Sequence, residues 1–245
     1  MKKYKNIYVN GCSFTAGHEL PEGTTWPELV ASEYNIRPII QAKNGQSFES
    51  IVINTISQVT KLDPKNTLVL IGLTWPERYL VQFDNFNFNI TPADLGRNKR
   101  SFQDKLSTWR RISSPYSTDK FEIDEMHNNL NKQKTNYVLS SYVKFYEKLL
   151  LHDKNLYKNQ KTKYTTLLIL LQSFLKDKGY DFLFIKFQRD AEVYYEVDQN
   201  LLNNIDKSKI LDFYMKDNCT TDTTGHPTAE CSILIKDSVI KKLNG

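Results

Sequence analysis

Four polar features of the sequence combine residue types that suit acyl-transfer chemistry. Ser13 lies in residues 11–17 (GCSFTAG), directly after a short apolar run, and Asn44-Gly45 and Thr74 each follow a later apolar run. His226 precedes the last helical pattern of the chain. A nucleophilic serine needs a base within hydrogen-bond reach and donors for the oxyanion that develops on the substrate. The serine can be the nucleophile and the histidine its base. Glycines beside the serine allow backbone amides to approach the substrate as oxyanion donors.

The hydropathy pattern predicts the elements that would bring these residues together. Apolar runs predict strands at 7–9, 38–42, 67–71, 182–185 and 210–214. Helices are predicted to begin after the capping residues Thr25 and Ser47, to run from about Thr165 to Lys178, and to follow Pro227. Strands separated by single helices indicate right-handed crossovers and a parallel sheet. We therefore predict an α/β fold with about five parallel strands and helices on both faces.

The carboxyl ends of parallel strands meet at one edge of the sheet, where open α/β sheets bind their ligands. Ser13, Asn44-Gly45 and Thr74 all follow predicted strands, so we expect them at this edge. We also predict that a ring nitrogen of His226 comes within hydrogen-bond reach of the Ser13 hydroxyl. His18 lies in a predicted loop near Ser13 and is a weaker candidate for substrate contact.

Residues from about 79 to 160 interrupt the alternation of strands and helices. Aromatic residues are interspersed here among Asn, Lys, Asp and Ser, and one helix is predicted at about 137–151. We predict that this segment is an insertion into a single domain spanning residues 1–245, and that it packs over or beside the strand-end pocket. Its aromatic side chains suit a cap that stacks on a carbohydrate, and an oligomer contact or a surface elaboration is the alternative.

The composition indicates a folded protein that does not bind nucleic acid. The apolar content of 40% and aromatic content of 12% are typical of globular proteins, and the net charge of +5 comes from scattered lysines, which favours a solvated surface. The segment before Gly11 lacks the apolar core of a signal peptide, and no run approaches the ~18 apolar residues of a membrane span. We expect a soluble, cytoplasmic protein without a membrane partner.

The cysteines give little indication of cross-links or metal binding. Cys12, Cys219 and Cys231 are few, odd in number and without the spacing of metal ligands. We therefore expect neither a disulfide framework nor a zinc site, and the cysteines fit a reducing compartment. No cofactor is expected, and the oligomeric state stays open.

Taken in order, four short segments resemble the sequence blocks of the SGNH hydrolase family. They are GCSFTAG at 11–17, NG at 44–45, IGLTWPER at 71–78 and GHP at 225–227. The similarity runs from Asn10 to Ile240 with only the middle segment unmatched, and it is closest to intracellular and phage-type members that open with GCSFT. It implies a flavodoxin-like α/β/α sandwich, with Ser13 as nucleophile and His226 as general base. The amides of Ser13 and Gly45 would be the oxyanion donors.

Two positions depart from the pattern of this family. Where its third block has a glycine followed by Asn, this chain has Thr74, whose hydroxyl donates a single hydrogen bond. The family's acid lies two or three residues before the histidine, but those positions are threonines here, and Asp222 lies four before His226. Asp222 is the preferred partner of the His226 ring and a loop carbonyl is the second choice. Otherwise the Ser13–His226 pair acts alone.

The resemblance implies a serine hydrolase that acts on a small-molecule or carbohydrate carboxylic ester, with the removal of acetyl groups from a sugar as one form of the reaction. Asn44 and Arg78 are then candidate substrate-binding residues. Arg78 could hold an anionic or sugar-hydroxyl group, and a structural salt bridge is its alternative role. Two other functions stay open: an acyltransferase that passes the acyl group to a second alcohol, and a non-catalytic binding or virion protein with a degenerate site.

Overall fold

The computed structural model describes residues 4–76, 78–83, 86–90, 156–187, 197–215, 219–222 and 225–245. Its centre is a five-stranded sheet in the order β2-β1-β3-β6-β7. The strands are β1 (Asn6–Asn10), β2 (Ile39–Ile40), β3 (Thr67–Gly72), β6 (Asp181–Lys186) and β7 (Ile210–Asp212). All four pairings between neighbouring strands are parallel. The predicted parallel sheet of about five strands is therefore confirmed.

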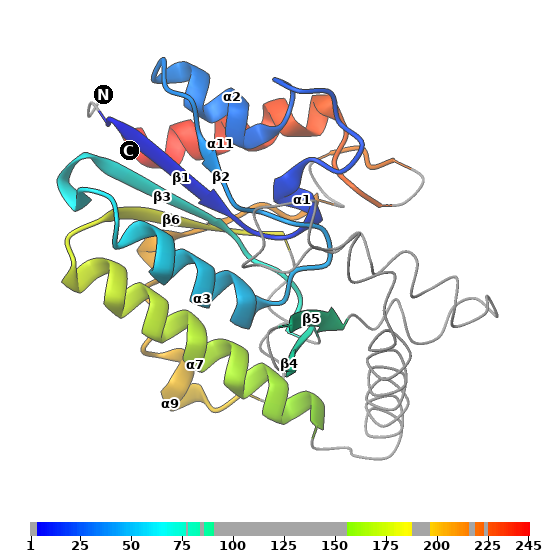
Figure 1. The fold of residues 1–245 in the computed structure, drawn as a ribbon, viewed down its shortest axis with the longest axis vertical. Helices are drawn as coiled ribbons and strands as arrows, with labels where there is room; N and C mark the ends of the chain where they lie inside the picture. The colour runs from blue at the N-terminus through cyan, green and yellow to red at the C-terminus, as the bar shows by residue number, and fades with distance from the viewer. Residues whose placement is uncertain are drawn as a thin grey trace.

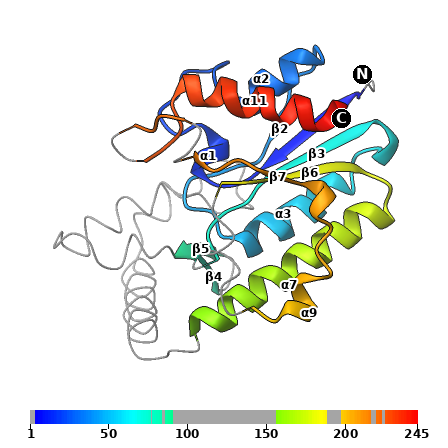
Figure 2. The same ribbon diagram turned by 180° about the vertical axis from the view of Figure 1, so that it is seen from behind.

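Helices cover both faces of this sheet (Figures 1 and 2). One face holds α2 (Trp26–Glu33) and α11 (Ala229–Asn244), and the other holds α3 (Phe48–Val59) and α7 (Leu156–Asp177). The shorter helices are α1 (Ser13–Ala16), α9 (Gln199–Leu202) and two 3-10 turns, η1 (Pro64–Asn66) and η4 (Lys207–Lys209). The chain is a three-layer α/β/α sandwich, as predicted.

Alternate residues of the central strands enter opposite cores. In β3, Leu68 and Leu70 pack toward α2 and α11, whereas Val69 and Ile71 pack toward α3 and α7. All four side chains are wholly buried. Burying one such side chain contributes about 1.5–3 kcal/mol of transfer free energy, so this strand is a main source of the stability of the sheet.

The predicted starts of α2 and α3 are confirmed by their capping contacts. Thr25 and Glu28 form a reciprocal capping box, in which the main-chain N–H of Thr25 donates to the Glu28 carboxylate at 3.1 Å. The Ser47 hydroxyl accepts a hydrogen bond from the main-chain N–H of Ser50 at 3.3 Å. The two caps fix the N-terminal ends of α2 and α3, which lie near the candidate site residues.

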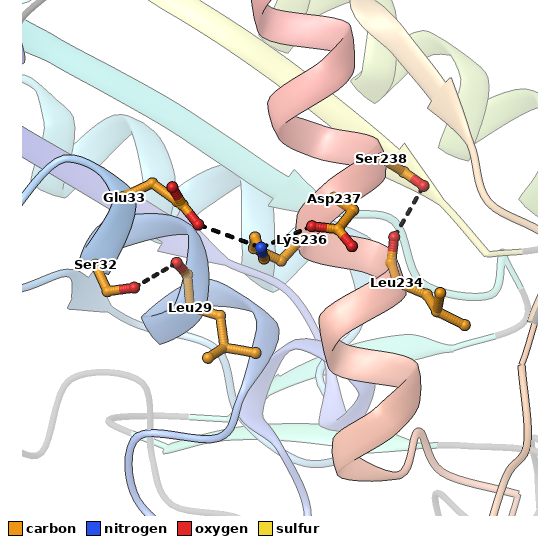
Figure 3. Close-up of polar contacts among 7 residues, drawn as sticks. All are labelled: Leu29, Ser32, Glu33, Leu234, Lys236, Asp237 and Ser238. Carbon is orange, nitrogen blue, oxygen red and sulfur yellow. Dashed lines mark hydrogen bonds and ion pairs between the residues drawn. The ribbon is translucent and has the colours of Figure 1, made fainter.

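A polar contact joins α2 to α11 across their exposed sides (Figure 3). The Lys236 ammonium lies 3.2 Å from the Glu33 carboxylate and 2.6 Å from the carboxylate of its neighbour Asp237. The hydrogen bonds that the Lys236 ammonium donates to Asp237 and, second in effect, to Glu33 raise the pKa of Lys236 above its ordinary value. Ion pairs this exposed stabilise weakly, so the apolar face beneath them holds α11 in place.

The structure differs from prediction beyond residue 78. The chain forms an antiparallel hairpin of β4 (Tyr79–Phe83) and β5 (Phe86–Ile90), where we expected no regular strands. The hairpin lies toward the end of the sheet where β1 and β3 finish (Figures 1 and 2), and β4 contacts α3. Helix α7 begins at Leu156 rather than at about Thr165, so the predicted end of the insertion at about 160 falls inside a helix.

The rest of the insertion, including the predicted helix at 137–151, lies outside the described residues. Its packing over the strand-end pocket and the single-domain organisation stay predictions. Within the described part of the chain, no helix has both the length and the apolar content to cross a membrane.

Candidate active site

Ser13 opens α1 in the turn that follows β1, and only 5% of its surface is exposed. The side chain of Asn10 fixes this turn. Its Oδ1 accepts a hydrogen bond from the N–H of Gly11 at 2.8 Å, and its Nδ2 donates to the Ile51 carbonyl at 3.2 Å and to the Thr55 hydroxyl at 3.1 Å. Asn10 is wholly buried. The turn that carries Ser13 is therefore tied both to the strand and to α3.

Two glycines allow α1 to pack directly on the strand ends. Gly11 and Gly72 lie beside the buried Thr15, and a Cβ atom at either glycine would overlap the Thr15 hydroxyl. On another side of α1, the indole N–H of Trp26 donates a hydrogen bond to the carbonyl of Phe14 at 3.1 Å. These contacts hold the short helix against β1, β3 and α2, which fixes where its first residue lies.

The segment after β2 brings Asn44 and Gly45 to the same edge of the sheet. The N–H of Lys43 donates to the Gly11 carbonyl at 3.2 Å, and the N–H of Gln46 donates to the Lys43 carbonyl at 3.3 Å. Gly45 has φ +73° at the third position of this turn, a conformation that glycine adopts without strain. That its amide acts as an oxyanion donor stays a prediction.

Thr74 and Arg78 follow β3. Thr74 is wholly buried, and its hydroxyl has no hydrogen-bond partner among the described residues. Buried hydroxyl groups are nearly always hydrogen-bonded, so this one suits a donor whose acceptor arrives with a substrate. The Arg78 guanidinium donates to the Gln46 carbonyl at 3.4 Å and lies over the Trp75 ring, 5.5 Å from its centroid. Neither contact is the salt bridge considered as its alternative role.

His226 lies in a short turned segment before α11. The main-chain N–H of His226 donates to the Asp222 carboxylate at 2.9 Å, and the N–H of Asp222 donates to the His226 carbonyl at 2.9 Å. Thr221 and Pro227 form an antiparallel bridge next to this pair. These contacts of Asp222 hold the main chain that presents the histidine. The predicted contact between the Asp222 carboxylate and the His226 ring stays a prediction.

A disulfide closes the same segment. Cys219 and Cys231 are bonded, although 12 positions separate them in the sequence, because the turn around His226 brings their Cα atoms to 5.1 Å. The expectation of reduced cysteines is therefore wrong for this pair, while Cys12 is free and buried. Disulfides persist in oxidising compartments, whereas the cysteine count favoured a reducing one, so the compartment stays a prediction.

The ring of His226 contacts two residues of the Ser13 turn. The Phe14 ring meets it edge-on, with 5.5 Å between the ring centroids, and the His18 ring lies 4.7 Å away. The main-chain N–H of His18 in turn donates to the Ser13 carbonyl at 3.3 Å. Ser13 and His226, more than 200 residues apart in the sequence, thus belong to one cluster of contacts.

The surroundings of His226 favour its neutral form. Its pKa lies below the ordinary value, mainly because the half-buried ring is desolvated, and next because of the positive charge that His18 can carry. Asp222 raises this pKa, Arg78 lowers it, and Glu19 raises it, in decreasing order of effect. A neutral imidazole can accept a proton near neutral pH, which is what a general base requires.

The strand-end residues predicted from the sequence thus surround one edge of the sheet. Contacts bring the Ser13 turn to His226, and Asn44 reaches the same cluster through His18, whose Nδ1 lies 2.8 Å from the Asn44 amide. Arg78 acts on His226 through its charge. The hydrogen bond between the Ser13 hydroxyl and the His226 ring stays a prediction. The sequence indicates His18 only weakly, yet its ring contacts both the His226 ring and Asn44.

Comparisons with known proteins find similar structures but no similar sequence. No protein-family model and no curated protein matches the chain. The psychrotrophic esterase EstA from Pseudoalteromonas sp. is similar in structure, with a TM-score of 0.50, 12% identity, and coverage of 98% of this chain and 97% of that one. A lipolytic protein of the G-D-S-L family from Veillonella parvula aligns with a TM-score of 0.48 and 13% identity over 97% of each chain.

The chain therefore has the same fold as the esterase EstA. In this fold, the Ser13 turn follows β1, next to the central strand β3, and the His226 segment precedes the last helix, α11. Thr74, the departure within the third block, lies two residues after the end of β3.

Proposed function

We propose that this chain is a serine hydrolase that cleaves a carboxylic ester through Ser13 and His226. The observation that carries the proposal is the contact of the His226 ring with Phe14 and His18, the residues that flank and hold the Ser13 turn. No local element requires the last loop of the chain to meet the first turn. A shared reaction centre would explain why these two distant segments lie together.

The reaction would proceed through an acyl-enzyme. Ser13 Oγ attacks the ester carbonyl carbon while the His226 ring accepts the hydroxyl proton. The bond from this carbon to the alcohol oxygen then breaks, and the alcohol leaves with the proton from His226. Water attacks the acyl carbon and gives a proton to His226. The bond from this carbon to Ser13 Oγ then breaks, Ser13 Oγ takes the proton back from His226, and the carboxylic acid leaves. The amides of Ser13 and Gly45, with the Thr74 hydroxyl, would donate to the oxyanion of each tetrahedral intermediate.

An aryl acetate assay with a phosphonylating reagent tests this function. We expect hydrolysis of a short-chain aryl acetate, and a single phosphonyl adduct by intact mass that peptide mapping places on Ser13. The Ser13→Ala variant should show neither. Ser32→Ala is a matched control, because Ser32 is an exposed serine on α2 that donates only to the Leu29 carbonyl of its own helix. No adduct and no turnover would favour the non-catalytic binding protein.

Substituting Thr74 tests the donor that replaces the family's Asn. We expect Thr74→Val to lower kcat by up to about 100-fold, since losing one oxyanion donor costs about 3 kcal/mol of transition-state stabilisation. Its free energy of unfolding should not fall, because the hydroxyl is buried without a partner among the described residues. Ser232→Ala, which removes a comparably buried hydroxyl on α11, should leave kcat unchanged. An unchanged kcat in Thr74→Val would contradict the donor role.

A further inference from the structure

His18 is anchored to the nucleophile's turn by its main chain. Its N–H donates to the Ser13 carbonyl at 3.3 Å, one turn beyond the start of α1. About a third of its side chain is exposed, and its Nε2 lies 3.6 Å from the carboxylate of Glu19. This main-chain hydrogen bond keeps His18 next to the turn that carries Ser13.

Asn44 fixes the orientation of this imidazole. Its Nδ2 lies 2.8 Å from His18 Nδ1. An amide NH2 group donates hydrogen bonds, so Nδ1 accepts this one when the ring hydrogen is on Nε2. The contact therefore holds the His18 ring in one orientation.

The fixed ring packs against the general base. The ring centroids of His18 and His226 are 4.7 Å apart, with 52° between the ring planes. Together with the Phe14 ring, whose centroid lies 5.5 Å away, two side chains next to Ser13 pack against the imidazole of His226. The ring of the base is thereby oriented by the same turn that presents the nucleophile.

We propose that His18 is a positioning residue for His226, which holds the imidazole of the proposed base against the Ser13 turn. The proposal rests on the serine-hydrolase function proposed above. It assigns a role to a histidine that neither the fold nor the sequence blocks of the SGNH hydrolases required.

The charges around His226 set the sign of the expected effect. His18 and Arg78 lower the pKa of His226, Asp222 and Glu19 raise it, and desolvation of the ring is the largest lowering effect. A general base loses activity as the pH falls through its pKa. Because His18 shields the ring from water and adds positive charge beside it, its presence moves the acid limb of the pH–rate profile to lower pH.

NMR titration of the four histidines, assigned by His→Gln substitutions, measures the pKa of His226 directly. We expect His18→Gln to raise this pKa, because it removes both the packed ring and the charge. His18→Phe should raise it less, because the phenyl ring still excludes water. The acid limb of kcat/KM for an aryl acetate should move to higher pH in the same order. Glu33→Gln, which removes a carboxylate between α2 and α11, is the control and should leave the titration unchanged.

The titrations can be repeated in the Ser13→Ala background, where no turnover is needed. An unchanged or lowered pKa of His226 in both His18 variants would overturn the positioning role. If His18→Gln fails to fold, His18→Phe alone decides by the same criterion. Full hydrolysis by Ser13→Ala would instead overturn the esterase mechanism, and the titration would still report on His18.

Discussion

Replacing Ser13 with alanine is expected to lower ester turnover by several orders of magnitude, and His226→Ala should do so to a similar extent. Ser13→Ala removes the atom that forms the acyl-enzyme, and His226→Ala removes the group that accepts its proton. The measurement is kcat for an aryl acetate, with circular dichroism to confirm that each variant folds.

The double variant Ser13→Ala/His226→Ala should be little slower than either single variant. Residues that act as one unit lose most of their joint effect when either is removed, so their changes in activation free energy do not add. Strictly additive losses would indicate two independent roles. Activity in Ser13→Ala equal to that of the unsubstituted chain would rule out the proposed nucleophile.

Removing the disulfide should destabilise the protein by about 3 kcal/mol, the loop-closure value for its 12-residue separation. For a chain of this size, such a loss lowers Tm by roughly 6–12 °C. We expect this shift in Cys219→Ala/Cys231→Ala by calorimetry, and in the unsubstituted protein after reduction. Because the bonded segment contains His226, kcat should fall as well, as the base spends less time in place.

Thiol titration of the denatured chain gives the control for this prediction. The chain has three cysteines, and one is free in the structure. We therefore expect one reactive thiol per chain before reduction and three after it. Cys12→Ala should keep the sensitivity of Tm to reductant, whereas the double cysteine variant should lose it. Three thiols in the unreduced protein would contradict the disulfide.

The central sheet was predictable because its strands are apolar on both faces. Buried parallel strands such as β3 read as continuous apolar runs, and capping residues such as Thr25 and Ser47 mark helix starts locally. The start of α7 was missed because its first turns, LYKNQKTK at 156–163, are largely polar and lack apolar periodicity. The hairpin β4–β5 was missed because its aromatic residues are interspersed with Asn and Asp.

The sequence could predict only which site residues follow strands, and therefore lie at one edge of the sheet. Ser13, Asn44 and Thr74 follow strands, so one sheet edge had to contain them. The role of His18 depends on a side-chain contact with a residue far away in the sequence, which no local pattern encodes. Likewise, the turn that brings Cys219 to Cys231 forms through long-range packing of α11, so cysteine count and spacing gave the wrong expectation.

The packing of α11 on α2 has a consequence for synthesis on the ribosome. Every other described element precedes α11 in the sequence, and the strands β1, β2 and β3 with α2 and α3 can emerge and pair first. Helix α11 docks through Ile235 and Val239, and this packing anchors the described residues of the His226 segment that precede it. Domains fold as units once their chain is available. Before α11 has docked, a nascent chain would therefore hold Ser13 in its turn without His226 beside it. The proposed hydrolytic activity would then begin only after α11 has docked.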